Sequence, residues 1–335
     1  MIQKCSQFLE TLDDYLNHYI IDQKGFSLNT QRSYKHTFQL LIEFFYTVQR
    51  KSSGDLQFTD LTYENLSAFL GWLETTRNCS ISTRNQRLAA LKSFSIFAQI
   101  KSIDAATVFR CAVLKITNKK SIPNEKSFFS LNEVKYLLES VEDSAIGHRN
   151  KALFSFMYAS GARAQEACDI KVKDIVFAEN KATVILHGKG NKSRRITIPD
   201  KPAKIMLNYL RETKKYGKTD EYIFSSQTHY HMTISCIEEI YKKYISIAKE
   251  NHPECFNGKY SPHSMRHTTA THMVEAGVSL FVIKNFLGHS SIETTQVYAK
   301  ITEQCFNSNV SKWSAQWLKP EEITSKPNNC PDFLR

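Results

Sequence analysis

The residues best suited to chemistry lie in the last quarter of the 335-residue chain. His263, Arg266 and His267 follow one another at helical spacing, and His289 and Tyr298 come soon afterwards. A guanidinium group matches two non-bridging phosphate oxygens, imidazoles move protons near neutral pH, and a tyrosine hydroxyl can attack phosphorus. This group of residues therefore predicts a site that handles a phosphate.

Two further cations come from far upstream. Arg163 follows a helix that stops at a glycine, and a new helix is expected to restart there with Glu166 close enough to orient the arginine. Such an arginine could also simply cap carbonyl groups or pair with an acid. Lys189 stands in the glycine-rich tip of a predicted hairpin with strands at 182–186 and 195–198. A strand follows this tip, so it is no nucleotide-binding P-loop, and its lysine could donate a proton to a leaving oxygen.

The two histidines of the 263–267 helix also have the spacing of a zinc-binding pair. A zinc site would need a third ligand, and the neighbour that shares this helix face is the cation Arg266. We therefore expect no metal. His263, nearer the helix start and solvent, is predicted to face the site, whereas His267 is predicted to be a satisfied core histidine with a supporting role. Ser261 is predicted to cap the helix, with Pro262 in its first position.

The first part of the chain predicts a small helical domain. Apolar residues recur at spacings of three and four over 30–46, 62–74 and 82–98, which is the pattern of amphipathic helices. The third helix starts with arginines and amides, which suit a DNA backbone, although a solvated polar face is the alternative. The residues predicted to contact DNA are Arg32, Lys35, Thr83, Arg84, Arg87 and, in the hairpin tip, Lys192.

A linker separates this domain from the next one. Residues 117–127 show no apolar period and contain a central proline. Ser130 and Glu133 then make a capping box that opens a new domain. The expected organisation is a helical domain at 1–116, a linker at 117–127, a second domain at 128–318 and a mobile tail at 319–335.

The composition favours an acidic partner. The chain has 44 Lys and Arg against 33 Asp and Glu, a net charge of +11, which favours a polyanion without proving one. The eight cysteines form no Cys-x-x-Cys pair and are typical of reduced thiols. No secretion signal or membrane-length apolar run occurs. We expect a cytoplasmic, nucleoid-associated protein with no membrane partner.

Four stretches resemble, in order, the catalytic boxes of the tyrosine recombinases, also called phage-type integrases. They are residues 159–166, 188–192, 263–267 and 287–298. The nine-residue step from His289 to Tyr298 agrees as well, and the two-domain plan is similar to that of the Cre and Xer types. Gln165 and Cys168 depart from the apolar or small residues expected there, but this departure removes no reactive group.

The resemblance implies a mainly α fold with a small antiparallel β-sheet. A helical, SAM-like core-binding domain would precede an α+β catalytic domain. The implied partners are double-stranded DNA with inverted-repeat core sites and three further subunits, as a homo-tetramer or a hetero-tetramer with a related recombinase, acting through a Holliday junction. An aromatic helix at about 303–318 would pack on its own domain or dock on a neighbouring subunit.

The resemblance also implies a role for each reactive residue. Tyr298 would attack the scissile phosphate to form a 3′-phosphotyrosine link, and His263 would accept its proton. The remaining roles would be phosphate binding by Arg163, Arg266 and His289 and protonation of the leaving 5′-oxygen by Lys189. No cofactor is implied, because the phosphodiester energy is kept in the tyrosine link.

Two other functions use overlapping features. A type IB topoisomerase shares the arginine, lysine, histidine and tyrosine chemistry but relaxes supercoils as a monomer. A DNA-binding regulator without catalysis would need none of the reactive positions to be filled. The small N-terminal domain and the aromatic helix favour recombination, with integration, excision, transposition and dimer resolution as its possible outcomes.

Overall fold

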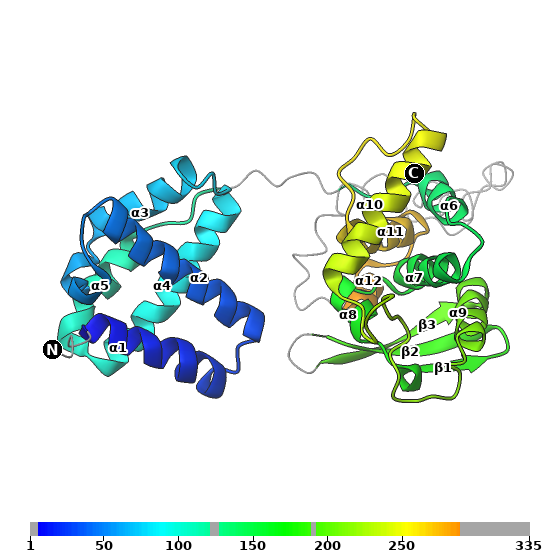
Figure 1. Cartoon of the computed structure of the whole chain (residues 1–335), viewed down its shortest axis with the longest axis horizontal. Coiled ribbons are helices and arrows are strands. Elements are labelled where there is room, and N and C mark those ends of the chain that lie inside the picture. The colour runs from blue at the N-terminus through cyan, green and yellow to red at the C-terminus, as the bar shows by residue number, and fades with distance from the viewer. Residues whose placement is uncertain (1–5, 121–126, 189–191, 289–335) are drawn as a thin grey trace, which may run out of the picture. The chain divides into compact units, whose positions relative to one another are not determined.

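The chain forms two compact units, each with its own buried core (Figure 1). They comprise Met1–Asn124 and Glu125–Arg335. The computed structural model describes residues 6–120, 127–188 and 192–288.

The N-terminal unit is built from helices. Its elements are α1 (Gln7–Asp14), a π-helical continuation (Tyr15–Gln23), α2 (Leu28–Thr47), two 3-10 turns (Ser53–Asp55 and Phe58–Asp60), α3 (Tyr63–Thr75), α4 (Ile81–Lys101) and α5 (Ile103–Lys115). The hydroxyls of Ser27, Thr62 and Ser80 cap α2, α3 and α4 by accepting a backbone N–H. The three predicted helices are confirmed, each with slightly different ends, whereas α1 and α5 were not predicted.

Aromatic rings fill the core of this unit around α4. Phe94 is fully buried and its ring centroid lies within 6.2 Å of those of five others. These neighbours are Phe8, Tyr15, Phe38, Phe58 and Phe109. Aromatic pairs at such distances add to the stabilisation that burial provides. The position of α4 is consequently fixed by contacts from α1, α2 and α5.

The C-terminal unit combines a three-stranded sheet with helices. Its elements are α6 (Leu131–Glu139), α7 (Ala145–Ser160), α8 (Ala164–Asp169), a 3-10 turn (Val172–Asp174), β1 (Ile175–Ala178), β2 (Lys181–His187), β3 (Ser193–Pro199), α9 (Asp200–Glu212), α10 (Ile234–Asn251), α11 (Pro262–Glu275) and α12 (Leu280–Leu287). The sheet is antiparallel with order β1-β2-β3. The fold class predicted from the sequence is confirmed.

The sheet buries one face against helices. Val184 of β2 and Ile196 of β3 are paired and buried, and burial alternates along both strands. Helices α7 and α9 pack against these strands (Figure 1). The predicted hairpin is confirmed, with His187 and Ser193 as the last pair before its tip, whereas β1 was not predicted.

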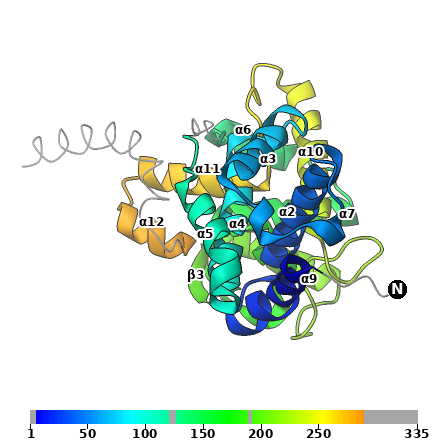
Figure 2. The ribbon, with the colours of Figure 1, turned by 90° about the vertical axis from the view of Figure 1, so that its left-hand side faces the viewer.

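Two glycines end the helices that surround the predicted site. Gly161 follows α7 at φ +57° and Gly288 follows α12 at φ +66°, the left-handed conformation that favours glycine. A Cβ on Gly161 would lie 2.6 Å from Cδ2 of Leu287, so this glycine also permits the close approach of α12. Helix α12 packs beside α11 (Figure 2).

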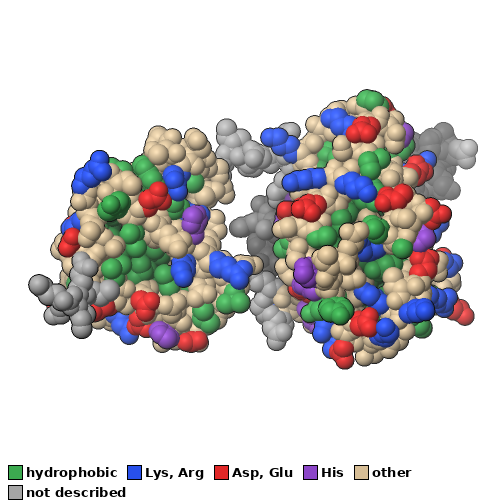
Figure 3. All heavy atoms as spheres, in the orientation of Figure 1, with side chains coloured by type: hydrophobic (Ala, Val, Ile, Leu, Met, Phe, Trp, Pro, Cys, Tyr) green, Lys and Arg blue, Asp and Glu red, His purple; other side chains and the backbone are tan. Residues whose placement is uncertain are grey.

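Charges of both signs are mixed over the surface. On the face of the C-terminal unit seen in Figure 3, lysines and arginines alternate with acidic side chains. Some of these charges form exposed ion pairs, such as Lys173 with Asp220 at 2.9 Å, which contribute little to stability. In the described part of the chain, we find no helix with the length and apolar character needed to cross a membrane.

Candidate active site

Arg163 occupies the corner between α7 and α8. It is the N-cap residue of α8, with extended backbone at φ −72° and ψ 155°. Its backbone N–H donates to Oε2 of Glu166 at 2.8 Å, and its Nη1 donates to Oε1 of the same carboxylate at 2.7 Å. Glu166 therefore holds Arg163 at both ends, while the arginine side chain remains 36% exposed.

A second arginine binds the same carboxylate. Arg194 on β3 donates from Nη1 to Oε1 and from Nη2 to Oε2 of Glu166, both at 2.8 Å. Its Nε donates to the backbone carbonyl of Phe286 at 2.9 Å. We call Arg163, Glu166 and Arg194 the Glu166 cluster. Burial alone would raise the pKa of the Glu166 carboxyl, but hydrogen bonds and charge from the two arginines outweigh it and lower the pKa.

Arg266 joins α11 to both neighbouring helix ends. Its Nη1 donates to the carbonyl of Gly161 and its Nη2 to that of Leu287, each at 2.6 Å. The residue is only 6% exposed. Because carbonyls at a helix C-terminus lack partners within the helix, a cation there satisfies them and favours the helix dipole. Arg266 thus ties the ends of α7 and α12 together, and Gly161 lies two residues before Arg163.

The start of α11 carries the two histidines singled out in the sequence. Ser261 is the N-cap residue with Pro262 at the start of the helix, and the Ser261 N–H donates to the hydroxyl of Ser264. His263 is exposed and His267 is half-buried. His263 is consequently the histidine of this helix that a bound molecule can reach most easily. No group of three or more His, Cys, Asp or Glu side chains that could hold a metal ion occurs among the residues described.

Three predicted catalytic residues lie outside the described residues, as does the predicted helix at 303–318. These three residues are Lys189, His289 and Tyr298. The residues just before two of them are described. A Cβ on Gly188 would lie 3.5 Å from Oε1 of Glu166, and a Cβ on Gly288 would lie 3.0 Å from Cδ of Arg194. The chain therefore passes the Glu166 cluster immediately before Lys189 and again immediately before His289.

The residues predicted to contact DNA differ in exposure. Arg32, Lys35 and Lys192 are exposed, and Thr83 is half-buried in the first turn of α4. Arg84 is 6% exposed. Its Nη1 donates to the carbonyl of Thr117 at 2.9 Å. In this structure Arg84 therefore holds the chain that follows α5.

Arg87 is also engaged within its own unit. Its Nη1 donates to the carbonyl of Ser33 at 2.9 Å and to the hydroxyl of Thr37 at 3.1 Å. Desolvation lowers the pKa of its guanidinium. The arginine thus links α4 to α2 and is half-buried between them.

Arg194 is the residue of this site that the sequence reasoning missed. The predicted strand covered 195–198, so Arg194 lay one residue before it, whereas the strand in the structure begins at Ser193. The neighbouring Arg195 is exposed, whereas Arg194 is 11% exposed at its side chain. The alternation of side chains along a strand could have identified it. Ile196 and Ile198 point inward, and Arg194 lies two residues before Ile196, on the same face of the strand.

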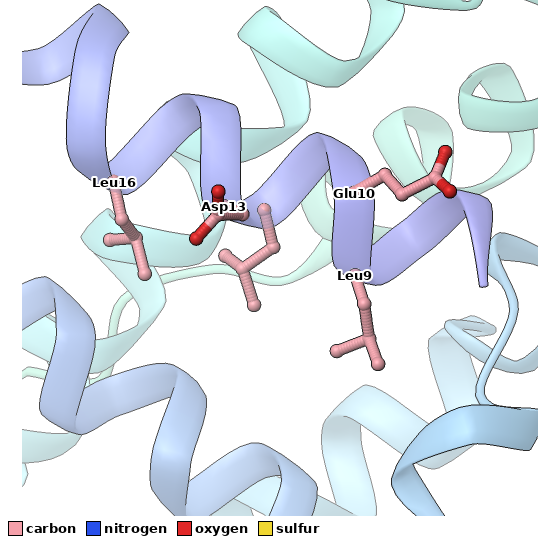
Figure 4. Close-up of a pocket in the computed structure, with 5 residues that line it drawn as sticks. Leu9, Glu10, Asp13 and Leu16 are labelled. Atoms are coloured by element: carbon pink, nitrogen blue, oxygen red, sulfur yellow. The ribbon is translucent and has the colours of Figure 1, made fainter. Parts of the chain in front are cut away.

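A hollow on the N-terminal unit has a different character. It has a volume of about 410 Å³ and is lined by one side of α1 and the start of its π-helical continuation (Figure 4). Its lining consists of Leu9, Glu10, Leu12, Asp13 and Leu16. Two carboxylates and three leucines offer no cation to a phosphate, so the hollow does not extend the site.

Comparison with known proteins gives the class of the chain. The profile of the phage integrase family matches residues 127–304, and that of the phage integrase N-terminal SAM-like domain matches residues 8–101. A tyrosine recombinase XerC of Caldanaerobacter subterraneus is 28% identical over 316 residues, covering 90% of this chain and 86% of that protein. XerC of Vibrio vulnificus is 27% identical over 292 residues, 87% of each.

Solved structures agree on the fold. The XerH site-specific recombinase bound to its difH substrate has a TM-score of 0.67 at 20% identity, covering 89% of this chain and 84% of that one. A lambda integrase dimer bound to a core site has a TM-score of 0.63 at 16% identity, covering 86% and 94%. The chain belongs to the phage integrase family and is a tyrosine recombinase, which confirms the family that the four stretches predicted.

Proposed function

We propose that the chain cuts and rejoins DNA strands through a covalent link to Tyr298. One observation carries the proposal: Arg266 binds the Gly161 carbonyl at the α7–α8 corner that holds Arg163, and the chain passes the Glu166 cluster just before Lys189 and just before His289. This convergence suits a single phosphate. Residues far apart in the sequence would then act on one phosphorus atom.

The chemistry balances without an external cofactor. The Tyr298 oxygen forms a bond to phosphorus as the bond to the 5′-oxygen breaks, and the tyrosine proton passes to His263. Lys189 gives a proton to the leaving 5′-oxygen. Attack by a 5′-hydroxyl on the phosphotyrosine link reverses these steps and joins the new strand.

The cations stabilise the charge that develops on phosphorus. Arg163 and Arg266, with His289, would contact the non-bridging oxygens, whose negative charge grows in the transition state. Fixed donors of this kind need no reorganisation when the reaction occurs. Glu166 keeps Arg163 in place through two hydrogen bonds. His267 would support this arrangement from within the α11 helix.

We further propose a duplex DNA partner with inverted-repeat core sites. The XerH structure contains its difH substrate and the lambda integrase dimer contains a core site, which supports a DNA partner for this chain. The net charge of +11 fits such a partner. Four subunits would assemble on DNA and exchange its strands through a Holliday junction. The helix at about 303–318 would dock on a neighbouring subunit.

The two units would have different roles on DNA. The N-terminal domain, 1–116, would grip the core site, with Arg32 and Lys35 as exposed cations on α2. The catalytic domain, 128–318, would carry out strand transfer, and the linker at 117–127 would join them. Lys192 beside the hairpin tip would add a contact to the DNA backbone.

The test uses a nicked duplex that contains a site selected by the protein from a random library. Cleavage beside the nick releases a short strand and traps the covalent complex. Tyr298→Phe should abolish the SDS-resistant adduct and leave binding to the same duplex intact, because the ring remains and only the attacking oxygen is lost. Binding should weaken steeply as salt rises.

The matched control is Tyr230→Phe, which removes the hydroxyl of a 93% exposed tyrosine in the same unit. It should form the adduct at the wild-type level. An undiminished adduct in Tyr298→Phe would overturn the assignment of the nucleophile. An absence of any adduct with the wild-type protein would overturn the proposed strand transfer itself.

A further inference from the structure

Arg194 saturates the carboxylate that holds Arg163. Each Glu166 oxygen accepts two hydrogen bonds, one from Arg163 and one from Arg194, with distances from 2.7 to 2.8 Å. A carboxylate offers about four lone-pair positions, so all of them are used. Glu166 itself is 3% exposed at its side chain. This arrangement is therefore fixed within the protein and is not a surface ion pair.

The charges of the cluster show what Arg194 adds. Arg163 and Glu166 alone would cancel one another, and a phosphate would meet a neutral pair. Arg194 supplies a second positive charge from the buried side of the same carboxylate, so one positive charge remains uncompensated. Of the two arginines, Arg163 is the more exposed, at 36% against 11%. The remaining charge is thus presented on the solvent side, through Arg163.

Arg194 also fixes the segment that leads to His289. Its Nε donates to the carbonyl of Phe286, close to the end of α12, while its side chain lies under Gly288. One planar guanidinium consequently contacts α8 and α12 at once. A lysine could supply the charge but not this forked geometry.

We propose that Arg194 is a positioning residue for strand transfer, which frees the charge of Arg163 for the scissile phosphate by neutralising Glu166. The inference rests on the proposed function. It differs from a purely structural role in one respect: the defect caused by losing Arg194 should depend on the charge of Glu166.

The experiment measures single-turnover formation of the covalent adduct on the nicked duplex at saturating protein. Arg194→Met keeps much of the side-chain volume but removes the charge, and we expect an adduct rate about 100-fold lower, as for small misplacements of catalytic groups. The double variant Arg194→Met, Glu166→Gln removes both charges and again leaves that of Arg163 uncompensated. Its adduct rate should be about tenfold higher than that of Arg194→Met.

Two controls accompany these variants. Arg149→Met removes a half-buried arginine that binds Asn150 and Ser225 in the same unit, and it should cleave at the wild-type rate. Thermal unfolding shows which variants fold. Arg194→Gln, which keeps one amide donor, replaces Arg194→Met if the latter does not fold, alone and combined with Glu166→Gln.

The outcomes separate this inference from the proposed function. A wild-type protein that forms no adduct would overturn the proposed function. If the wild-type protein forms the adduct and Arg194→Met forms it at the same rate, only the role of Arg194 would be overturned. A double variant as slow as or slower than Arg194→Met would also overturn it, because the defect would then not depend on the Glu166 charge. Recovery in the double variant supports the inference.

Discussion

Two arginine-bearing helix starts, one in each unit, looked alike in the sequence and differ in the structure. Arg84 opens α4 in the N-terminal unit and Arg163 opens α8 in the C-terminal unit, and both were predicted to meet a phosphate. The Arg84 side chain is 8% exposed, whereas the Arg163 side chain is 36% exposed. For these two helix starts, the difference is therefore how much of each guanidinium remains accessible after its internal contacts are made.

The start of α4 holds its own chain. Arg84 donates to the carbonyl of Thr117, and its Nε lies 3.6 Å from a carboxylate oxygen of Glu74. The Asn85 amide donates to the carbonyl of Lys119 and accepts its N–H. These contacts bind the chain after α5 back onto α4. We call the contacts of Arg84 and Asn85 with residues 117–119 the linker clasp.

The start of α8 is arranged in the opposite way. Glu166 receives Arg163 on one side and Arg194 on the other, and both of its oxygens are satisfied inside the protein. Glu74 beside Arg84 also has a second cation, Lys119 at 2.9 Å, but that lysine side chain is 52% exposed, whereas that of Arg194 is 11% exposed. The comparison suggests that a place at a helix start does not by itself make an arginine a phosphate-binding one. Arg163 keeps an exposed side chain, whereas the Arg84 guanidinium is used within its own unit.

The largest expected effect tests this difference directly. Arg163→Ala should lower the rate of covalent adduct formation about 10²- to 10³-fold, because a donor to the transition-state phosphate is lost. The fold should persist, since Arg194 still neutralises Glu166. Single-turnover assays on the nicked duplex measure the rate. Arg84→Ala under the same conditions should cleave within a few-fold of wild type, and equal losses in both variants would refute the distinction.

Arg84→Ala should instead act on stability. Removing a buried guanidinium leaves the Thr117 carbonyl without this donor and removes a cation from beside Glu74, at a cost of about 1–3 kcal/mol. Urea unfolding of the full chain measures the change. The matched control is Arg77→Ala, whose exposed pair with Glu43 at 3.3 Å should contribute about 0–1 kcal/mol. A smaller loss for Arg84 than for Arg77 would contradict the linker clasp.

The sequence predicted local features well and long-range contacts poorly. Apolar spacing located α2, α3 and α4, and glycine preference located the ends of α7 and α12, because these signals lie within a few residues. The contact of Glu166 with Arg163 could be predicted because the two are three residues apart. Arg194 is 28 residues from Glu166, and Arg84 is 33 from Thr117. No local pattern encodes such pairs.

Acid should weaken the Glu166 cluster. The pKa of Glu166 lies below its ordinary value of 4.5 in the folded protein, so the carboxylate stabilises the fold above that value, and the contribution is lost as pH falls through the folded pKa. Glu166→Gln should therefore have a lower free energy of unfolding than wild type at neutral pH. The difference between the two free energies should become smaller below pH 4.5. Urea unfolding at several pH values measures the difference.

Glu133 provides a parallel case outside the cluster. Burial would raise the pKa of its carboxyl, but hydrogen bonds from Ser130, Tyr260 and Phe256 outweigh burial and lower the pKa. The difference in the free energy of unfolding between Glu133→Gln and wild type should consequently also become smaller as the pH falls. A difference that stays constant with pH for Glu166→Gln but narrows for Glu133→Gln would mean that the arginines do not stabilise the charged form of Glu166.

The smallest expected effect concerns Asn85 and tests the linker clasp without disturbing the core. Asn85→Ala removes two hydrogen bonds to Lys119, at 2.8 and 3.1 Å, on an exposed surface where water can replace them. Global stability should fall by about 1 kcal/mol or less. Hydrogen exchange of the Lys119 amide should become faster, because its acceptor is gone. Asn17→Ala, which breaks an exposed contact with Asp13, should leave that amide unchanged. Unchanged protection of Lys119 in Asn85→Ala would show that Arg84 holds the chain after α5 without help from Asn85.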